Sequence, residues 1–279
     1  MYKLSNTIIR DKYPSLLYTN SYSFFDSIIK QIEDIYCIDI NHSHPNKYGL
    51  VCMNNASPDS SEYFVDQCSK YQSVGLYLHH MITDVFTNAN TEQTITTLKS
   101  IPFYRSITFC TDIKNNDNTN YNIVYGLPKH TKDILNKNRK DVLILANPII
   151  SETSINLQKS IQAAGTNCDI SDNIASLDIE ETYDMLSDYK LIIDNYSYIN
   201  LIAAAYCGAK VMTASTNMIN EAFISRLHND SSSYVKNLLN NFSVDTGVVS
   251  YLENKYNYDN FIKSFKTILN NINQELFYI

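Results

Sequence analysis

Short apolar runs alternate with helical patterns along nearly the whole chain. In residues 1–130 the apolar runs are SLLYT, IYCIDI, YGLVCMNN, SVGLYLHH, RSITFCTD and YNIVYGLP. In residues 131–279 they are DVLILANP, NCDIS, KLIIDN, KVMTAST and TGVVSYLEN. Short apolar runs separated by helical segments are typical of buried strands joined by helical crossovers. The pattern predicts an α/β fold with parallel sheets.

The stretches between these runs predict helices. In the first half they are SYSFFDSIIKQIEDI, DSSEYFVDQCSKY and NTEQTITTLKSI; in the second they are SETSINLQKSIQAAG, SLDIEETYDMLSDY, YINLIAAAYCG and YDNFIKSFKTILNNI. Several begin with a Ser, Thr, Asp or Asn that can cap the first turn. Gly165 and Gly208 stand where a helix has to end before a strand.

A polar segment divides the chain into two parts of similar size. Residues Lys129 to Lys140, KHTKDILNKNRK, show no core face, so we interpret them as a linker. The prediction is an N-terminal Rossmann-like domain over residues 1–130 and a C-terminal one over residues 131–279. Their parallel sheets are expected to face a central cleft, because ligands of open α/β sheets bind at the carboxyl ends of the strands.

Composition narrows the class of protein. Of the 279 residues 44% are hydrophobic and 18% are charged, as in globular proteins. The net charge of −7 disfavours extended nucleic-acid binding, which needs clustered Lys and Arg, although it leaves room for a local basic groove. No apolar run approaches about 18 residues, so no membrane span is expected.

Cysteine use and residue bias indicate where the protein works. Cys37, Cys52, Cys110 and Cys207 lie in apolar runs, as buried free thiols do in a reducing compartment. We therefore expect a cytoplasmic protein. The N-terminal stretch MYKLSNTIIRDKYPSLLY lacks a continuous apolar run that ends in a cleavage site, so no secretory signal is expected. The 22 tyrosines, the abundant Asn and the absence of Trp are typical of an AT-rich genome, such as that of a phage or another virus, in which case the compartment is the host cytoplasm.

Three segments resemble glycosyltransferases of the GT-B fold. SDYKLIIDNYSYINLIAAAYCGAKVMTAST resembles their donor-binding unit, and TGVVSYLENKYNYDNFIKSFKTIL resembles the strand, loop and helix that follow it. SVGLYLHHMITD resembles the strand that delivers a His to the acceptor side. The resemblance implies a metal-independent enzyme without a cofactor, which moves a sugar from a nucleotide-sugar donor to an acceptor such as a glycan or a modified nucleobase.

Two departures from that family concern the donor. Retaining members carry a Glu in the Ala-rich helix, where this chain has Ala203, and they place Arg and Lys after the first strand of the second domain. Here that loop has no basic residue before Lys159. A diphosphate would then depend on helix N-terminal amides, near Ser151 to Ser154 or Ser197 to Asn200.

The resemblance assigns candidate site residues. His79 and His80 end an apolar strand, and a cleft His can take a proton from the acceptor hydroxyl; His80 is favoured because it is closer to Asp84, which would orient it. The alternative is a polar loop without function. The residues expected to hold the donor are Asn147, Ser151, Ser154, Asn195, Ser197, Tyr198, Asn200 and Thr213. For the loop before the Ala-rich helix the alternative is capping, and for Thr213, with Ser215, it is exposure to solvent.

Other polar groups predict no chemistry. His42 and His44 form an H-x-H pair, but no second cluster completes a metal site, so no metal is predicted. Glu180, Glu181 and Asp184 are interpreted as the solvated face of a helix. The sequence lacks D-x-D, G-x-G-x-x-G, the P-loop pattern and G-x-S-x-G, which disfavours metal-dependent GT-A enzymes, nicotinamide dehydrogenases, P-loop ATPases and hydrolases.

Two other functions stay open on the sequence. The first is a GT-B-like module without catalysis, acting in binding or structure, for instance in a virion or a virus–host contact; the missing carboxylate and basic residues favour it. The second is a two-domain binder of a small ligand. Donor binding with slow donor hydrolysis distinguishes the enzyme from the module.

Overall fold

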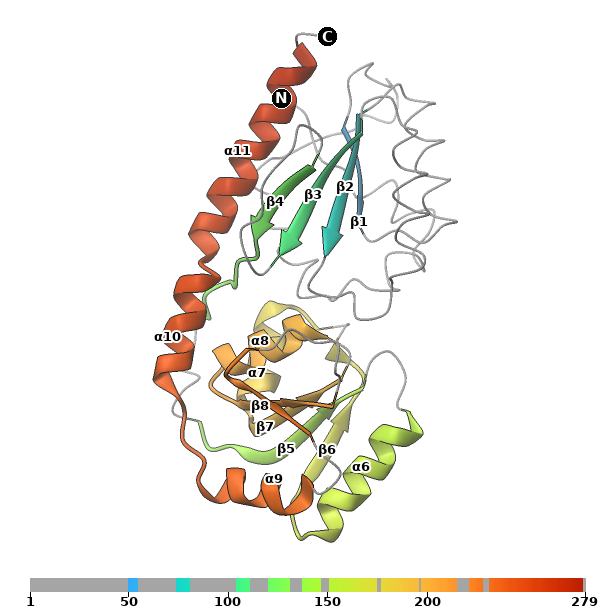
Figure 1. The fold of residues 1–279 in the computed structure, drawn as a ribbon, viewed down its shortest axis with the longest axis vertical. Coiled ribbons are helices and arrows are strands. Elements are labelled where there is room, and N and C mark those ends of the chain that lie inside the picture. The colour runs from blue at the N-terminus through green and yellow to red at the C-terminus, as the bar shows by residue number, and fades with distance from the viewer. Residues whose placement is uncertain are drawn as a thin grey trace. The chain divides into compact units, whose positions relative to one another are not determined.

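The computed structural model describes residues 50–54, 74–80, 104–110, 120–130, 137–146, 151–174, 177–195, 197–214, 221–227 and 231–277. These residues form two compact units (Figure 1). The described residues up to Gly126 and from Tyr258 onward belong to the first unit, and those of Leu127–Asn257 belong to the second.

The first unit contains a four-stranded parallel sheet. Its strands are β1 (Leu50–Asn54), β2 (Val74–His80), β3 (Tyr104–Cys110) and β4 (Asn120–Val124), in the order β1-β2-β3-β4. They confirm the strands predicted from the last four apolar runs of the first half. The runs SLLYT and IYCIDI lie outside the described residues.

The last helix of the chain belongs to this first unit. Helix α11 (Tyr258–Phe277) packs against β4, and the ring centroids of Tyr125 and Phe261 are 6.0 Å apart. Gly126 permits the approach, because a Cβ there would lie 2.5 Å from the Cβ of Phe261. The sequence-based division placed this helix in the C-terminal domain. Its apolar face predicts a helix on a core but does not say which sheet provides that core.

The second unit contains a five-stranded parallel sheet. Its strands are β5 (Lys140–Leu145), β6 (Cys168–Ser171), β7 (Tyr189–Asp194), β8 (Lys210–Thr213) and β9 (Ile224–Arg226), in the order β6-β5-β7-β8-β9. The first four confirm predicted strands. Strand β9 was not predicted, since three residues are too few to show a periodic pattern. Parallel sheets in both units confirm the predicted α/β fold class.

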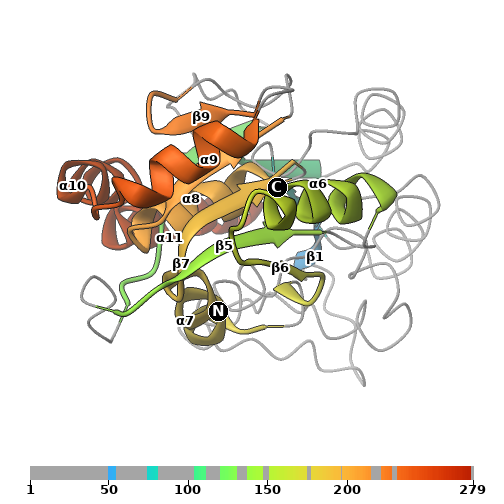
Figure 2. The ribbon, with the colours of Figure 1, turned by 90° about the horizontal axis from the view of Figure 1, so that it is seen from below.

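Helices cover both faces of this sheet. They are α6 (Glu152–Ala163), α7 (Ile179–Ser187), α8 (Tyr198–Tyr206), α9 (Ser231–Asn240) and α10 (Thr246–Lys255). Figure 2 shows α6 and α9 side by side, where Ile161 and Val235 pack on Leu191, Ile193 and Met212. Helix α8 is buried throughout and contacts β7, β8, α7 and α10.

The helix stops were predicted correctly. Gly165 and Gly208 have φ angles of 80° and 81°, a left-handed conformation that favours glycine at the end of a helix. Helices α6, α7 and α8 confirm their predictions, whereas α9 was not predicted.

The prediction of a strand at TGVVSYLEN was wrong. The segment is helix α10, which Asp245 caps by accepting a hydrogen bond from the Val248 amide at 3.1 Å. Leu252 is buried and its neighbour Tyr251 is 44% exposed. A single buried residue, with Val248 and Val249 half-buried one turn before it, suits a helix at the edge of a core. An apolar pair such as Val248–Val249 is too short to decide between a strand and a helix.

The prediction of a linker without core contacts was wrong at its ends. Arg139 is buried, and its guanidinium donates hydrogen bonds to the carbonyls of Tyr189 at 3.1 Å and Cys207 at 2.8 Å. Lys137 forms ion pairs with Asp184 and Asp188. Residues 131–136 lie outside the described residues. A buried Arg was missed because its partners are carbonyl groups, which no sequence pattern reveals.

Replacing Arg139 with alanine is expected to destabilise the second unit. The variant leaves two buried carbonyls without their charged donor, and each such bond contributes about 1.5–3 kcal/mol. We expect the free energy of unfolding, measured by urea denaturation, to fall by about 3 kcal/mol. Lys140→Ala is the control, since its side chain is 64% exposed and a surface ion pair contributes at most about 1 kcal/mol. Equal losses in the two variants would contradict this role of Arg139.

Candidate functional site

The strand order of the second sheet creates a switch point between β5 and β7. From β5 the chain passes through α6 to β6 on one side, and it then returns through α7 to β7 on the other side. In open parallel sheets the crevice outside the carboxyl ends of two such strands is where ligands bind. The segments that leave β5 and β7 contain most of the predicted donor-binding residues, so the fold gathers these residues at one edge of the sheet.

A buried carboxylate organises the loop between β7 and α8. Asp194 is 1% exposed; its Oδ1 accepts a hydrogen bond from the Ser197 amide at 2.9 Å, and its Oδ2 accepts one from Asn200 Nδ2 at 2.8 Å. The Ser197 hydroxyl in turn accepts a hydrogen bond from the Asn200 amide at 3.4 Å. Both Ser197 and Asn200 are buried. The network fixes the start of α8 to the end of β7.

This carboxylate changes the electrostatics of the α8 N-terminus. A helix N-terminus carries a partial positive charge that favours an anion, and here the chain supplies its own. A phosphate that approached Ser197 and Asn200 would meet side chains already engaged with Asp194 and a like charge behind them. The capping alternative therefore describes what the Ser197 side chain does in the structure, while the Asn200 side chain is bound to Asp194. Their contact with a donor stays a prediction.

Asn195 and Thr213 meet at the ends of β7 and β8. The Asn195 Oδ1 accepts hydrogen bonds from the Ala214 amide at 2.7 Å and from the Thr213 hydroxyl at 3.5 Å. Thr213 is fully buried, so its side chain does not face solvent. Ser215 lies outside the described residues. The two side chains close the gap between neighbouring strands at the carboxyl edge.

The start of α6 lies at the same edge, after β5. Ser151 is the N-cap: its hydroxyl accepts a hydrogen bond from the Ser154 amide at 3.1 Å and lies 3.0 Å from the buried Ser154 hydroxyl. Glu152 and Thr153 are exposed in the first turn. The first amides of a helix have no intrahelical acceptor, so they are available to an anion at this end. Asn147 lies outside the described residues.

Tyr198 belongs to a buried polar cluster. Its hydroxyl donates a hydrogen bond to Glu221 Oε1 at 3.2 Å, and Lys255 Nζ pairs with the same oxygen at 2.9 Å. Burial, followed by the proximity of Tyr256 and Glu221, raises the pKa of Tyr198 well above its usual range. Burial likewise raises the pKa of Tyr256 to about 12. Partial burial lowers the pKa of Lys255, but its hydrogen bonds to Glu221 and Tyr251 outweigh this effect and raise it overall.

Two residues of this edge were missed by sequence reasoning. Arg226 ends β9 and pairs in register with Thr213, which places a cation at the carboxyl edge. It was missed because β9 itself was not predicted. Asp194 was included only as the end of an apolar run. An acidic residue that follows five strand residues and precedes a helix start is a signal that was available.

The predicted catalytic residues belong to the first unit. His79 and His80 are the last two residues of β2, at the carboxyl edge of the first sheet, and their register partners are Thr108 and Phe109 of β3. Asp84 lies outside the described residues, as do His42 and His44. In the described part of the chain no group of three or more His, Cys, Asp or Glu residues is placed to hold a metal ion.

The remaining polar candidates have structural roles. Glu181 and Asp178 form a capping box at the start of α7, and Asp184 pairs with Lys137 at 3.2 Å. Cys110, Cys168 and Cys207 are buried thiols that form no disulfide. Burial raises the pKa of Cys168 to about 12, so its thiol is not a nucleophile near neutral pH. Among the described helices none is long and apolar enough to cross a membrane.

Two pockets of the second unit lie at the opposite edge of its sheet. One, of about 640 Å³, is lined by residues at the amino ends of β8 and β9. The other, of about 420 Å³, is lined by residues at the amino ends of β5, β6 and β7. Neither is the crevice at the switch point. We place the candidate donor site at the carboxyl edge because that is where parallel sheets bind ligands.

Among solved structures, the chain is similar in fold to glycosyltransferases. The glycotransferase of kitacinnamycin matches with a TM-score of 0.50 and 8% identity, over 89% of this chain and 81% of that one. SsfS6 of Streptomyces sp. SF2575, complexed with thymidine diphosphate, matches with a TM-score of 0.43 and 9% identity, over 81% of this chain and 67% of that one. SnogD of Streptomyces nogalater matches with a TM-score of 0.43 and 7% sequence identity, over 87% of this chain and 74% of that one.

Sequence comparison adds no family. No protein-family model matches the chain, and no curated protein matches it. The likeness to the kitacinnamycin enzyme concerns the fold, which is the GT-B-like α/β architecture that the sequence predicted.

Removal of the Asp194 carboxylate is expected to cost stability. Asp194→Ala leaves the Ser197 amide and the Asn200 side chain buried without their acceptor, and each unsatisfied group costs about 1–3 kcal/mol. We expect the free energy of unfolding to fall by about 2 kcal/mol or more. Asp178→Ala, which removes an exposed helix cap, is the comparison and should cost about 1 kcal/mol. A smaller loss for Asp194→Ala than for Asp178→Ala would contradict the proposed weight of the buried network.

Alkaline pH is expected to destabilise the second unit through the tyrosine cluster. Tyr198 and Tyr256 bind their protons more tightly in the folded chain than in the unfolded chain, where the pKa of tyrosine is about 10. Their contribution to stability is therefore full below that pH and is lost as the pH rises through the pKa of Tyr256, about 12. Urea denaturation at about pH 8 and about pH 11 should show this fall.

Matched variants isolate the cluster. Tyr256→Phe keeps the ring and removes one titrating group, so the stability lost between the two pH values should shrink. Tyr234→Phe changes an exposed tyrosine and should leave that loss unaltered. An equal loss of stability between the two pH values in the wild-type chain and in Tyr256→Phe would contradict the role of the tyrosine cluster.

Proposed function

We propose that the chain is a metal-independent glycosyltransferase that transfers a sugar from a nucleotide-sugar donor bound at the carboxyl edge of the second sheet. The observation that carries this proposal is the strand order β6-β5-β7-β8-β9, which brings the predicted donor-binding segments together at the β5–β7 switch point. The GT-B-like fold, shared with a glycosyltransferase, supports it.

The charges at this edge favour one position for the diphosphate. Asp194 occupies the N-terminus of α8 and repels a second anion there. The N-terminus of α6, on the β5 side, has the exposed and solvent-screened Glu152 in its first turn instead of a buried carboxylate, and Arg226 at the end of β9 adds a positive charge to the edge. The diphosphate then binds at α6, with the nucleoside toward Asn195 and Thr213.

His80 is the proposed base of the reaction, with His79 as its alternative. It takes the proton of the acceptor hydroxyl while that oxygen bonds to the anomeric carbon of the donor sugar. The bond from that carbon to the diphosphate breaks, and the nucleoside diphosphate leaves with the electron pair. Asp84 is the residue proposed to orient the imidazole. The acceptor is a glycan or a modified nucleobase, and the chemistry needs no cofactor.

One observation favours a second function. Ser197, Tyr198 and Asn200 are buried and already hydrogen-bonded within the protein. A chain whose donor loop has become an internal network is also consistent with a GT-B-like module that binds or scaffolds without catalysis. Donor binding decides between the two functions.

A nucleotide-sugar screen by thermal shift tests the proposed function. UDP, GDP, ADP, CMP and their common sugars are added to the full chain; a ligand at about 100 times its Kd stabilises the folded state by about 2.7 kcal/mol and raises the Tm. Thr153→Glu puts a negative charge in the first turn of α6, which favours the helix but repels a diphosphate. We expect the ligand-induced shift to fall in this variant while the Tm without ligand is kept.

Matched variants complete the test. Thr267→Glu makes the same change on α11 and should keep the shift. Arg226→Gln should weaken nucleotide binding about tenfold, whereas Lys236→Gln, on the exposed side of α9, should not. His80→Ala should keep the shift and lose slow hydrolysis of the donor. If no nucleotide changes the Tm of the wild-type chain, the transferase proposal fails and the non-catalytic module is favoured.

A further inference from the structure

The pocket of about 640 Å³ in the second unit is separate from the proposed donor site. It lies where α8 ends and α10 begins, beside Lys210, the first residue of β8, and Phe223, which precedes β9. Its lining includes Ala205, Gly208 and Ala209, which are too small to fill the space. Its volume falls within the range of small-molecule sites, roughly 300–1,000 Å³.

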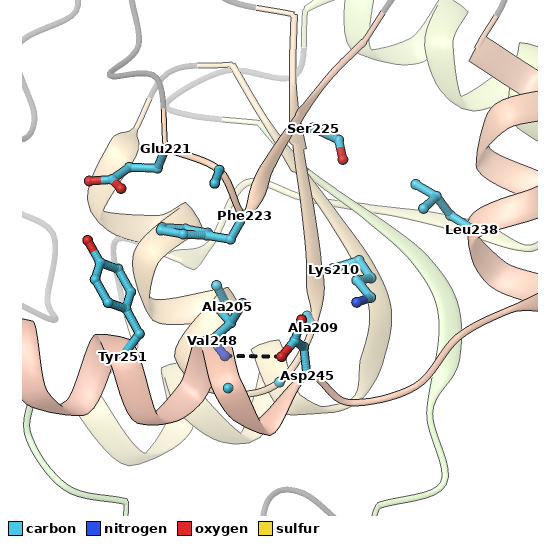
Figure 3. A pocket seen from close by; sticks show the side chains of 13 residues that line it. Ala205, Ala209, Lys210, Glu221, Phe223, Ser225, Leu238, Asp245, Val248 and Tyr251 are labelled. Atoms are coloured by element: carbon cyan, nitrogen blue, oxygen red, sulfur yellow. Dashed lines mark hydrogen bonds between the residues drawn. The ribbon is translucent and has the colours of Figure 1, made fainter.

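Aromatic side chains line one end of this pocket. Figure 3 shows Phe223, from the turn before β9, together with Tyr251 of α10 and Glu221, while Lys210, Ser225 and Leu238 line the other end. Tyr251 is 44% exposed, so its ring is accessible to a ligand. One side of the ring is supported by Lys255, whose Nζ lies 5.6 Å from the ring centroid. The ring is an accessible apolar surface.

The polar groups around the pocket are both donors and acceptors, and their charges nearly cancel. Lys210 contributes an ammonium group, while Glu221 and Asp245 contribute carboxylates. The charge of Glu221 is offset by its 2.9 Å pair with Lys255. This balance gives no preference to a phosphate or to a metal cation. It suits a neutral ligand whose hydroxyls donate to carboxylates and accept from the ammonium group.

We infer that this pocket binds a neutral saccharide, with a sugar ring against the aromatic side chains of Tyr251 and Phe223 and its hydroxyls toward Glu221, Asp245 and Lys210. The apolar face of a pyranose covers the ring, and the hydroxyls around its edge meet the polar groups. The site lies at the amino edge of the sheet, so it is distinct from the donor crevice and does not depend on transferase activity.

Saturation-transfer difference NMR on the full chain tests the site. The probes are the β-methyl glycosides of glucose, galactose and N-acetylglucosamine, the disaccharides maltose, cellobiose and lactose, and uridine monophosphate as an anionic probe. At least one saccharide should receive saturation from the wild-type chain. Tyr251→Ala and Phe223→Ala should reduce its signal at least fivefold, whereas Tyr234→Ala should keep it.

Tyr234 is the control because it is 43% exposed and does not itself line the pocket; its hydroxyl lies 3.4 Å from that of Ser225, at the end of the pocket away from the aromatic rings. The Tm of each variant is measured to check that it folds. Tyr251 is on the surface, so its replacement should leave the core intact. Three outcomes overturn the inference: no saccharide receives saturation, the signal persists in both Tyr251→Ala and Phe223→Ala, or uridine monophosphate alone binds in a way that requires Tyr251. Tyr251 and Phe223 line the pocket at the amino edge of the sheet and not its carboxyl edge, so a signal from a sugar at the proposed donor site would persist in these variants.

Discussion

The buried carboxylate of Asp194 is the contact on which the second unit depends. It ends β7, fixes the loop that follows and satisfies the first turn of α8 through Ser197 and Asn200. Helix α8 is buried over its whole length. A shift of its first turn would therefore displace its contacts with both β7 and β8. A buried charge is stable only when its hydrogen bonds are complete, and here both oxygens are used.

The same carboxylate has a consequence for ligand binding. A helix N-terminus in a parallel sheet is a general anion site, and a chain that fills one such site with its own Asp directs a bound diphosphate to another. The start of α6, beside the switch point, and Arg226 at the end of β9 are the groups that can replace it. In the proposed function, the absent Glu at Ala203 and the absent basic loop correspond to a rearranged donor site.

The two edges of the second sheet offer different chemistry. The carboxyl edge presents amides, hydroxyls and a cation, which suit phosphate and nucleoside. The amino edge presents aromatic rings and balanced charges around an open pocket, which suit a neutral sugar. Both edges belong to one rigid core of strands and helices, and Glu221 contacts Tyr198 at one end and the pocket at the other.

Much of the fold was predictable from local patterns. The buried strands β5 and β7, the Ala-rich helix α8 and the stops at Gly165 and Gly208 follow from apolar runs and backbone preferences, which act over a few residues. Strand β9 was too short to show a pattern, and α10 was misread because a brief apolar pair fits both strand and helix. The burial of Arg139 was hidden because its acceptors are distant carbonyls.

The sequence by itself therefore determined the order of strands and helices, the α/β class and the segments where polar residues follow strands. Only the tertiary structure decided that α11 packs on β4, that Arg226 stands beside Thr213, and that Asp194 occupies the start of α8. Each of these depends on pairing between segments far apart in the chain. Local preferences do not select the partners; the packing of side chains and the completion of buried hydrogen bonds do.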